Sequence, residues 1–576
     1  MTRDRQCRAA RWTAVLSASM VALALAAGAR AAVPSPPFGE VVEVEVVDLA
    51  LVATDGQGKP VTDLTADELA VYDDGVRVKI DELVFLGRAG GAGAGGGSAA
   101  DAGAAEPLHL AILLDEVHVG ASSRLLLLDQ LARVMREQLG PRDRVMVAVY
   151  DGSTRVVLPF TTDRKALSAA FEAIEGVSTA RLLVEQDRRS TIESIVLDSE
   201  GGHGWCPCLH IAEFVDSFSE RESQRVERAA SALGVFADGL SGIRGRKMIV
   251  HVSDGIPLRP GYEEADLALR LCNGAAASQG EGGTDSTAFG PEVYGPEQRR
   301  LDAERYDSSK SWLEAAARAS ASEVTIYPIQ AGRSGETRVP IAETAPGRNI
   351  TISSTVHSDN LQETLFMLAD RTGGRALLGG GDIVADLKAA LAEQQGGYAL
   401  AYTPPASAEN ALHRVRIEST RPGLSLRYRT LYRRRSVDEQ IAGQLLARLL
   451  YGEPDETRRS GLELVSVTPG SHGAVKARFR LAVPFASLSL VDREQLRVGA
   501  FSVSLAVADD QGRSSPVRRT VVPVRVAPAA PQEEFDWEVE IAVRPGRQRV
   551  GLALRDEVGG ELSFLVREFV VGTPRK

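Results

Sequence analysis

The sequence predicts a multidomain protein. Its central α/β domain is a doubly wound, mostly parallel sheet, flanked by small β domains and followed by a C-terminal β-sandwich. From Leu108 onward, short apolar runs alternate with amphipathic helical patterns, which is the order of a doubly wound sheet. On either side lie short stretches with a two-residue alternation and turn signals. The 576 residues, 44% of them apolar, suffice for several cores.

The first 31 residues have the order of an export signal. A basic stretch, RDRQCRAAR, is followed by the apolar run WTAVLSASMVALALAAG and by Ala29-Arg30-Ala31, which fits a cleavage site. The alternative is a retained membrane anchor, for which this run is short. Removing five Arg and one Asp lowers the formal net charge of -11 by four, to -15. We expect an acidic, exported protein, periplasmic or extracellular, with no membrane span after signal cleavage.

Residues 38–87 are expected to form a small β (Ig-like) domain. The stretch EVVEVEVVDLALVATDGQGKPV alternates between apolar and polar residues, as a half-buried strand does. Asp74-Gly75 is a favoured two-residue hairpin turn. Residues 88–106 are rich in Gly and Ala, cannot bury a core, and are expected to form a linker.

Residues 107–404 contain the alternating strands and helices, with insertions. The predicted strands include LHLAILL, RVMVAVY, RKMIVHVSDG and VTIYPI. The predicted helices include SRLLLLDQLARVMREQLG, which ends at a Gly-Pro stop signal, and RKALSAAFEAI. A polar, insert-like region precedes the helix ESQRVERAASALGVFADGL. Residues 405–455 are expected to form β strands and a connecting helix, and residues 456–572 a β-sandwich domain.

Several of these stretches together resemble the von Willebrand factor A domain. The chain as a whole resembles exported bacterial proteins of the Acidobacteria type that contain an A-related domain. The resemblance covers about 360 residues and rests on LVATDGQGKPVTDLTADELAVYDDGV, LAILLDEVHV, GPRDRVMVAVYDGSTRVVLPFTTDRKAL, RKMIVHVSDG, VTIYPI, LADRTGGRAL and YALAYTPP, in the expected order. It implies a von Willebrand A-like fold and a role in binding other macromolecules.

The resemblance also implies a place for a divalent cation such as Mg²⁺. In the family, an Asp and two Ser of a D-x-S-x-S motif, a Thr and a second Asp form a metal-ion-dependent adhesion site (MIDAS). Carried over, the metal ligands are Asp115, Thr179 and Asp254, whereas Val117 and Val119 occupy the serine positions. Because valine offers no lone pair to a hard cation, we expect a degenerate MIDAS and no cofactor, with Mg²⁺ as the alternative. The aspartates would then accept hydrogen bonds from loop or helix amides.

Three cysteines remain after signal cleavage: Cys206, Cys208 and Cys272. They are disulfide candidates in an oxidising compartment, and their odd number leaves one free or intermolecular thiol. Which two of them pair stays open. The stretch HGWCPCLH, residues 203–210, offers zinc binding as an alternative, although its Cys-x-Cys spacing is tighter than is usual for structural zinc.

No residue is assigned a catalytic role. The sequence contains no G-x-S-x-G, no H-E-x-x-H and no complete phosphate loop, and no basic block that would favour nucleic acid. The leading hypothesis is a non-enzymatic exported protein of the binding or adhesion type, whose von Willebrand A-like domain contacts an unknown protein partner in the envelope or extracellular space. The alternatives are an exported hydrolase that uses the Asp115/Asp254 cleft and a purely structural envelope component.

Overall fold

The computed structural model describes most of the chain after residue 45. The described ranges are 46–86, 107–174, 179–200, 207–278, 305–332, 338–340, 349–351, 354–378, 382–405, 411–452, 461–470, 474–493, 495–510, 512–527 and 534–572. The predicted signal peptide, residues 1–31, and the predicted linker, residues 88–106, lie outside these ranges. Within them, no helix is both long and apolar enough to cross a membrane.

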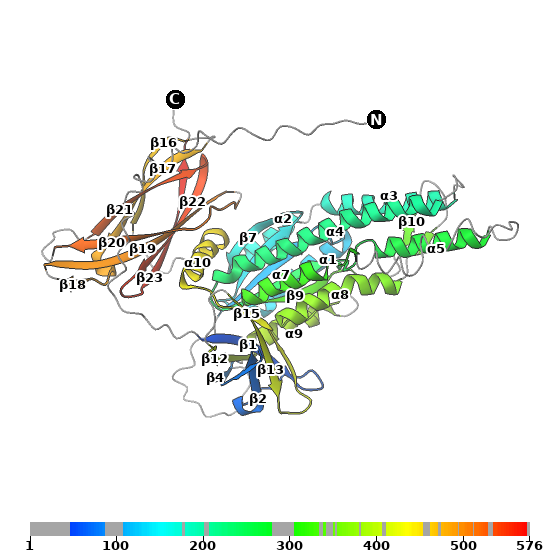
Figure 1. Cartoon of the computed structure of the whole chain (residues 1–576), viewed down its shortest axis with the longest axis horizontal. Coiled ribbons are helices and arrows are strands. Elements are labelled where there is room, and N and C mark those ends of the chain that lie inside the picture. Colours follow the sequence, from blue (N-terminus) through cyan, green and yellow to red (C-terminus); the bar gives the residue numbers. More distant parts are fainter. Residues whose placement is uncertain are drawn as a thin grey trace, which may run out of the picture. The chain divides into compact units, whose positions relative to one another are not determined.

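The central domain is built on a five-stranded sheet with the order β7-β6-β5-β8-β9 (Figure 1). The central strand β5 pairs in parallel with β6 and β8, and β8 pairs in parallel with β9. Only the edge strand β7 runs antiparallel to its neighbour. The sheet is therefore mostly parallel, as the sequence predicts. Its strands are β5 (Leu108–Asp115), β6 (Arg144–Tyr150), β7 (Thr154–Thr161), β8 (Arg246–Ser253) and β9 (Val324–Gln330).

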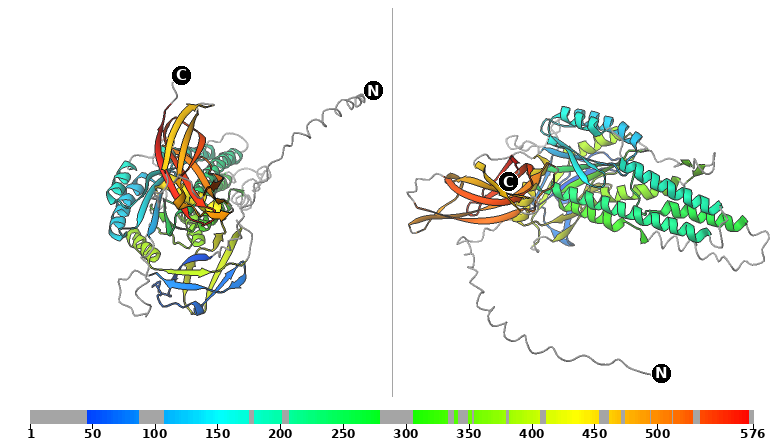
Figure 2. Two further views of the ribbon diagram at one scale, coloured as in Figure 1. Left: turned by 90° about the vertical axis from the view of Figure 1, so that its left-hand side faces the viewer. Right: turned by 90° about the horizontal axis from the view of Figure 1, so that it is seen from above.

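Helices cover both faces of this sheet, and this explains the unbroken apolar pattern of its central strand. All eight residues of β5 are buried. Leu110 and Ile112 pack in one core with α1 (Ala121–Gln138), α2 (Arg164–Ile174) and α9 (Ile383–Gln395). Ala111 and Leu113 pack in the core on the opposite face. The helices of that second core include α4 (Pro207–Gly239), α7 (Ser309–Ala321) and α8 (Ser354–Thr372) (Figures 1 and 2).

The insert-like region is largely helical, which the sequence did not predict. It contains α3 (Thr179–Glu200) and the first half of α4, and both pack against α5 (Tyr262–Ser278) around a small core of their own. Charged side chains on α3 have partners on the neighbouring helices. Arg188, for example, pairs with Glu263 and Glu264 of α5. In the sequence, these charged residues make the helix polar on all sides, so its buried face is not evident. A two-stranded sheet, β10 (Arg338–Pro340) with β11 (Asn349–Thr351), completes this domain.

The N-terminal strands do not form a separate domain, contrary to the prediction for residues 38–87. They share two antiparallel sheets, β14-β1-β12-β4 and β15-β13-β2-β3, with strands that follow the α/β domain in the sequence. Both sheets contribute to one core. The N-terminal strands alone are too few and too short to bury an apolar face. The strands are β1 (Val47–Thr54), β2 (Leu69–Asp73), β3 (Val76–Val78), β4 (Glu82–Phe85), β12 (Tyr398–Tyr402), β13 (Leu412–Ser419), β14 (Ser425–Tyr428) and β15 (Leu431–Arg433).

The region after residue 460 is a β-sandwich, in line with the sequence. One antiparallel sheet has the order β16-β17-β21 and the other β18-β19-β22-β23, with β20 also paired to β19, and both sheets face one core. The helix α10 (Val437–Tyr451) precedes it, begins at the N-cap Ser436 and packs Leu445 against the second sheet. The strands are β16 (Gly461–Pro469), β17 (Val475–Pro484), β18 (Val491–Arg493), β19 (Leu496–Asp509), β20 (Arg518–Val526), β21 (Glu534–Val543), β22 (Gly546–Asp556) and β23 (Leu562–Val571).

Candidate recognition site at the strand ends

The residues expected to hold a cation lie at the carboxyl edge of the central sheet, where open α/β sheets usually bind ligands. Asp115 is the last residue of β5, and Asp254 directly follows β8, its parallel neighbour. The loop between β5 and α1 joins them, because the Asp254 amide donates to the His118 carbonyl at 2.8 Å. The structure therefore brings two of the three predicted ligands to neighbouring strand ends.

Both carboxylate oxygens of Asp115 are used within the protein. Oδ1 accepts hydrogen bonds from the backbone amides of Val117 and His118, each at 3.1 Å. Oδ2 lies 2.8 Å from Nδ1 of His118 and 3.8 Å from Nε2 of His251. Asp115 is only 1% exposed. Asp115 thus accepts hydrogen bonds from loop amides, as the alternative to metal binding requires. Its histidine partner is not evident from the motif spacing.

The Asp115–His118 pair shifts both pKa values in opposite directions. Burial raises the pKa of Asp115, but the charge and hydrogen bond of His118, with a smaller contribution from the nearby His251, hold it well below its ordinary value. Burial lowers the pKa of His118, but Asp115, and to a lesser degree Glu222, raise it above 6.5. Each residue of the pair therefore favours the charged form of the other.

The two valines at the serine positions face the cores. Val117 is 7% exposed and packs on one face of the sheet, whereas Val119 is 1% exposed and packs on the other. Thr179 is the first residue of α3, and its side chain lies outside the described part of the structure. Both valine side chains are part of the hydrophobic cores. A serine at either position would therefore place its hydroxyl among apolar side chains.

Asp254 is also engaged by the protein. Its Oδ2 accepts from the amide of Gly120, the N-cap of α1, at 2.7 Å. The Ser123 hydroxyl also hydrogen-bonds to this carboxylate, but burial outweighs these contacts and raises the pKa of Asp254. A hard cation needs several ionised oxygen ligands in a near-octahedral shell. Both oxygens of Asp115 are bound within the protein. Oδ1 of Asp254 is buried and has no hydrogen-bond partner among the described residues, but this one oxygen does not make such a shell.

A buried ion pair fixes the loop on the first turns of α1. Glu116 and Arg124 are 6% and 2% exposed, and Nη1 of Arg124 donates to both carboxylate oxygens of Glu116, at 2.8 and 2.7 Å. The Glu116 amide donates to the Tyr150 carbonyl at 2.8 Å, which links the loop to the end of β6. The position of His118 is thus set by contacts on both sides of it in the sequence.

A cavity of about 310 Å³ opens beside His118 and Asp254. Its wall includes Arg181 and Arg188 of α3, Glu222 of α4, and residues of α5 and α8. His118 is 2% exposed, and its Nε2 has no hydrogen-bond partner among the described residues. Sequence reasoning missed both this role of His118 and the helices that form the cavity wall.

The cysteine predictions fall on parts that the structure does not describe. Cys206 lies outside the described residues. Cys208 and Cys272 belong to α4 and α5, but their side chains are not described. His203, at the start of the proposed zinc alternative, also lies outside the described residues.

The pKa shifts predict how stability depends on pH. Because the pKa of His118 is raised in the folded state, the stabilisation by the pair is complete below about pH 6.5 and is lost as the pH rises through the higher folded value. Because the pKa of Asp115 is lowered from 3.8, its contribution is present above that pH and is lost only in stronger acid. The thermal midpoint of the wild type should therefore fall more steeply between pH 6.5 and 9 than that of a His118→Gln variant. Equal slopes for the two proteins would contradict the assigned pairing.

Comparisons with known proteins give no family assignment. No family model matches the chain, and no curated protein matches it. Among solved structures, BatB from Bacteroides thetaiotaomicron is 12% identical with a TM-score of 0.24, covering 50% of this chain and 96% of that one. An aerotolerance-related membrane protein from Bacteroides fragilis is 12% identical with a TM-score of 0.25, covering 50% and 98%. The pilus tip protein Mfa5 from Porphyromonas gingivalis is 10% identical with a TM-score of 0.23, covering 93% and 78%.

Likenesses at these TM-scores carry no argument about function. The structure itself defines the class of protein as a multidomain chain with a mostly parallel α/β domain and two antiparallel β-sandwiches. The resemblance to von Willebrand A domains rests on the sequence motifs.

Proposed function

We propose that this is an exported, non-enzymatic binding protein of the adhesion type, and that its von Willebrand A-like domain recognises a protein partner without a divalent cation. One observation carries the proposal. Where a cation would accept oxygen ligands, Asp115 instead holds His118, whose Nε2 is buried on a cavity wall without a hydrogen-bond partner among the described residues. The histidine side chain therefore takes the carboxylate oxygen that a metal ion would bind.

The chemistry of the histidine defines what it would bind. Asp115 favours the protonated imidazole, in which Nε2 carries a hydrogen and acts as a donor. A buried donor without a partner costs about 1–3 kcal/mol. A hydrogen-bond acceptor of the partner, such as a carboxylate or carbonyl oxygen, would satisfy this donor and so bind at the strand ends.

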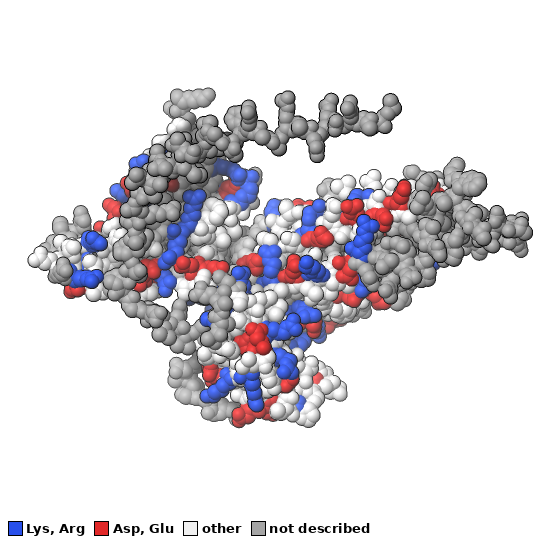
Figure 3. All heavy atoms as spheres, in the orientation of Figure 1, with Lys and Arg blue, Asp and Glu red and all other residues white. Residues whose placement is uncertain are grey.

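A binding role is better supported than the hydrolase alternative. A histidine base activates a nucleophile through a hydrogen bond to a hydroxyl or thiol. Among the described residues, Nε2 of His118 has no such partner, and the hydroxyl of Ser123, which lies on the same cavity wall, is directed to Asp254. On the face shown in Figure 3, basic and acidic side chains are interspersed, which favours local recognition over a long-range field of one sign.

Filling the cavity should abolish partner binding. Val184 of α3 is half-buried on the cavity wall, and Val184→Trp should occupy the space that the acceptor enters. The neighbouring Leu183 is 65% exposed, so Leu183→Trp adds the same side chain outside the cavity and is the matched control. The measurement is cross-linking of the exported chain in its native envelope, followed by mass spectrometry of the captured proteins.

We expect wild type and Leu183→Trp to capture the same partner, in chelator as well as in Mg²⁺, and Val184→Trp to lose it. Loss of the partner in chelator would show that recognition needs a cation, against this proposal. Esterase, protease or glycosidase activity that disappears in His118→Gln would support the hydrolase alternative instead. If no partner is captured at all, the structural role becomes the better explanation.

A further inference from the structure

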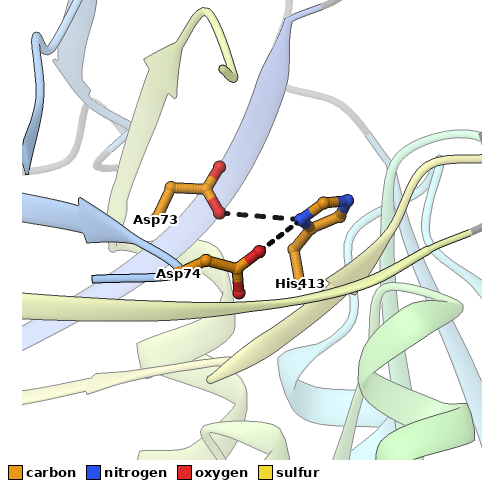
Figure 4. A group of neighbouring side chains, drawn as sticks. All are labelled: Asp73, Asp74 and His413. Carbon is orange, nitrogen blue, oxygen red and sulfur yellow. Dashed lines mark hydrogen bonds and ion pairs between the residues drawn. The ribbon is translucent and has the colours of Figure 1, made fainter. Parts of the chain in front are cut away.

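Two aspartates and one histidine meet at the hairpin between β2 and β3 (Figure 4). Asp73 is the last residue of β2, and Asp74 follows in the turn with φ 48°, ahead of Gly75 with φ 83°. Positive φ at both central positions is typical of a two-residue hairpin turn. His413 lies near the start of β13, which pairs antiparallel to β2, so residues 339 positions apart in the sequence become neighbours.

Asp73 is a buried carboxylate, and only one of its two oxygens accepts hydrogen bonds from the described residues. It is 1% exposed, and its Oδ2 accepts from the hydroxyls of Tyr402 and Tyr432, at 3.2 and 2.6 Å. Among the described residues, Oδ1 has no hydrogen-bond partner, and it points toward Nδ1 of His413, 3.9 Å away (Figure 4). Burying a carboxylate oxygen without a partner is costly, and a bound cation would remove that cost.

The other two side chains are held in place for such a cation. The ring of His413 is 5% exposed and stacks on Tyr432, with ring centroids 5.0 Å apart. Its Nδ1 lies 2.8 Å from Oδ2 of Asp74, whose Oδ1 accepts from the Arg414 amide at 2.9 Å. Asp74 is about half exposed, so the cluster can be reached from solvent on this side.

We propose that Asp73, Asp74 and His413 form a zinc site. Their ligand atoms all lie within 4.8 Å of one another, and no other set of three His, Cys, Asp or Glu residues in the described part of the chain does so. Adjacent ligands of a tetrahedral Zn²⁺ ion are roughly 3.4 Å apart, given zinc–ligand distances of about 2.0–2.2 Å. Nδ1 of His413 lies 2.8 Å from Oδ2 of Asp74 and 3.9 Å from Oδ1 of Asp73, and these two distances lie on either side of that value.

The donor set selects the metal. One imidazole nitrogen with two carboxylates suits Zn²⁺ and similar transition metals, whereas Mg²⁺ and Ca²⁺ bind mainly oxygen. The tyrosine hydroxyls on Oδ2 of Asp73 orient its Oδ1 as a ligand, as hydrogen bonds to metal-binding carboxylates commonly do. Water would complete the shell. The ion would tie the N-terminal hairpin to β13, a role that does not depend on the function proposed above.

The test compares the full chain with variants of the exposed ligand. Asp74→Asn is the most informative, because asparagine tolerates positive φ and can keep the contacts to His413 and the Arg414 amide without the charge. Asp67→Asn changes an exposed aspartate of the same two-sheet unit and is the control. His413→Gln removes the nitrogen ligand as a second variant. Equilibrium dialysis against Zn²⁺ and thermal unfolding in Zn²⁺ or Mg²⁺ give two readouts.

We expect wild type and Asp67→Asn to bind one more Zn²⁺ ion than Asp74→Asn and His413→Gln, or to bind it at least tenfold more tightly. Zn²⁺, but not Mg²⁺, should raise their melting temperature, and this rise should be absent from both ligand variants. Zinc bound by Cys206 and Cys208 would be common to all four proteins and would cancel in the difference. Equal binding by wild type and the ligand variants, or no binding by wild type at micromolar Zn²⁺, would overturn the assignment.

Discussion

Replacing Arg124 with methionine is expected to lower the local stability of β5 and α1 by about 3–5 kcal/mol. The reason is that Glu116, only 6% exposed, would lose the guanidinium that contacts both of its carboxylate oxygens. Removing one member of a buried ion pair is costly because the remaining charge stays desolvated. Hydrogen exchange of the β5 amides measures this local opening in a chain with several cores.

Two controls separate this effect from simple loss of a contact. Arg480→Met removes an exposed pair with Glu463, whose side chains are 47% and 64% exposed, and should cost no more than about 1 kcal/mol. The double variant Glu116→Leu with Arg124→Met replaces both charges by apolar groups and should recover most of the loss. If Arg124→Met were as mild as Arg480→Met, the loop would not depend on the buried pair, and the position of His118 would need another explanation.

The central sheet could be predicted from the sequence because its signals are local. The unbroken apolar run of β5 indicates a strand buried on both faces, and the aspartate after it marks the strand end. The helix α2 begins and ends at the residues of the predicted stretch, Arg164 and Ile174. Patterns of this kind depend only on neighbouring residues, so they need no knowledge of the fold.

The features that were missed depend on contacts between distant segments. The pairing of Val47 with Tyr402 cannot be read from either strand, since both show the same alternation as any half-buried strand. The metal-ligand cluster requires the register that sets Val415 opposite Asp73. At the strand ends, the D-x-V-x-V spacing shows which ligands are lost, but not that the histidine between the two valines turns back onto Asp115.

Asp115→Ala is expected to destabilise the central α/β domain by about 3–5 kcal/mol without changing any response to Mg²⁺. The substitution leaves Nδ1 of His118, a residue only 2% exposed, without its carboxylate partner and removes the acceptor of two backbone amides. The measurement is thermal unfolding of the full chain with excess Mg²⁺, Mn²⁺ or Ca²⁺ and with chelator, for wild type and variant. A ligand that binds the native state must raise its melting temperature.

A stabilising shift by Mg²⁺ that Asp115→Ala abolishes would contradict this prediction and show a working cation site. Serine at positions 117 and 119 gives a second test. In the von Willebrand A domains that the sequence resembles, serines at these positions are ligands, but the valines here are 7% and 1% exposed and lie in the two cores. Val117→Ser with Val119→Ser should therefore lower stability, because it buries hydroxyls among apolar side chains. It should create no Mg²⁺ response, since Asp115 would still be bound to His118. A further change of His118 to a residue that does not bind Asp115 would free only Oδ2, because Oδ1 would still accept from the two backbone amides.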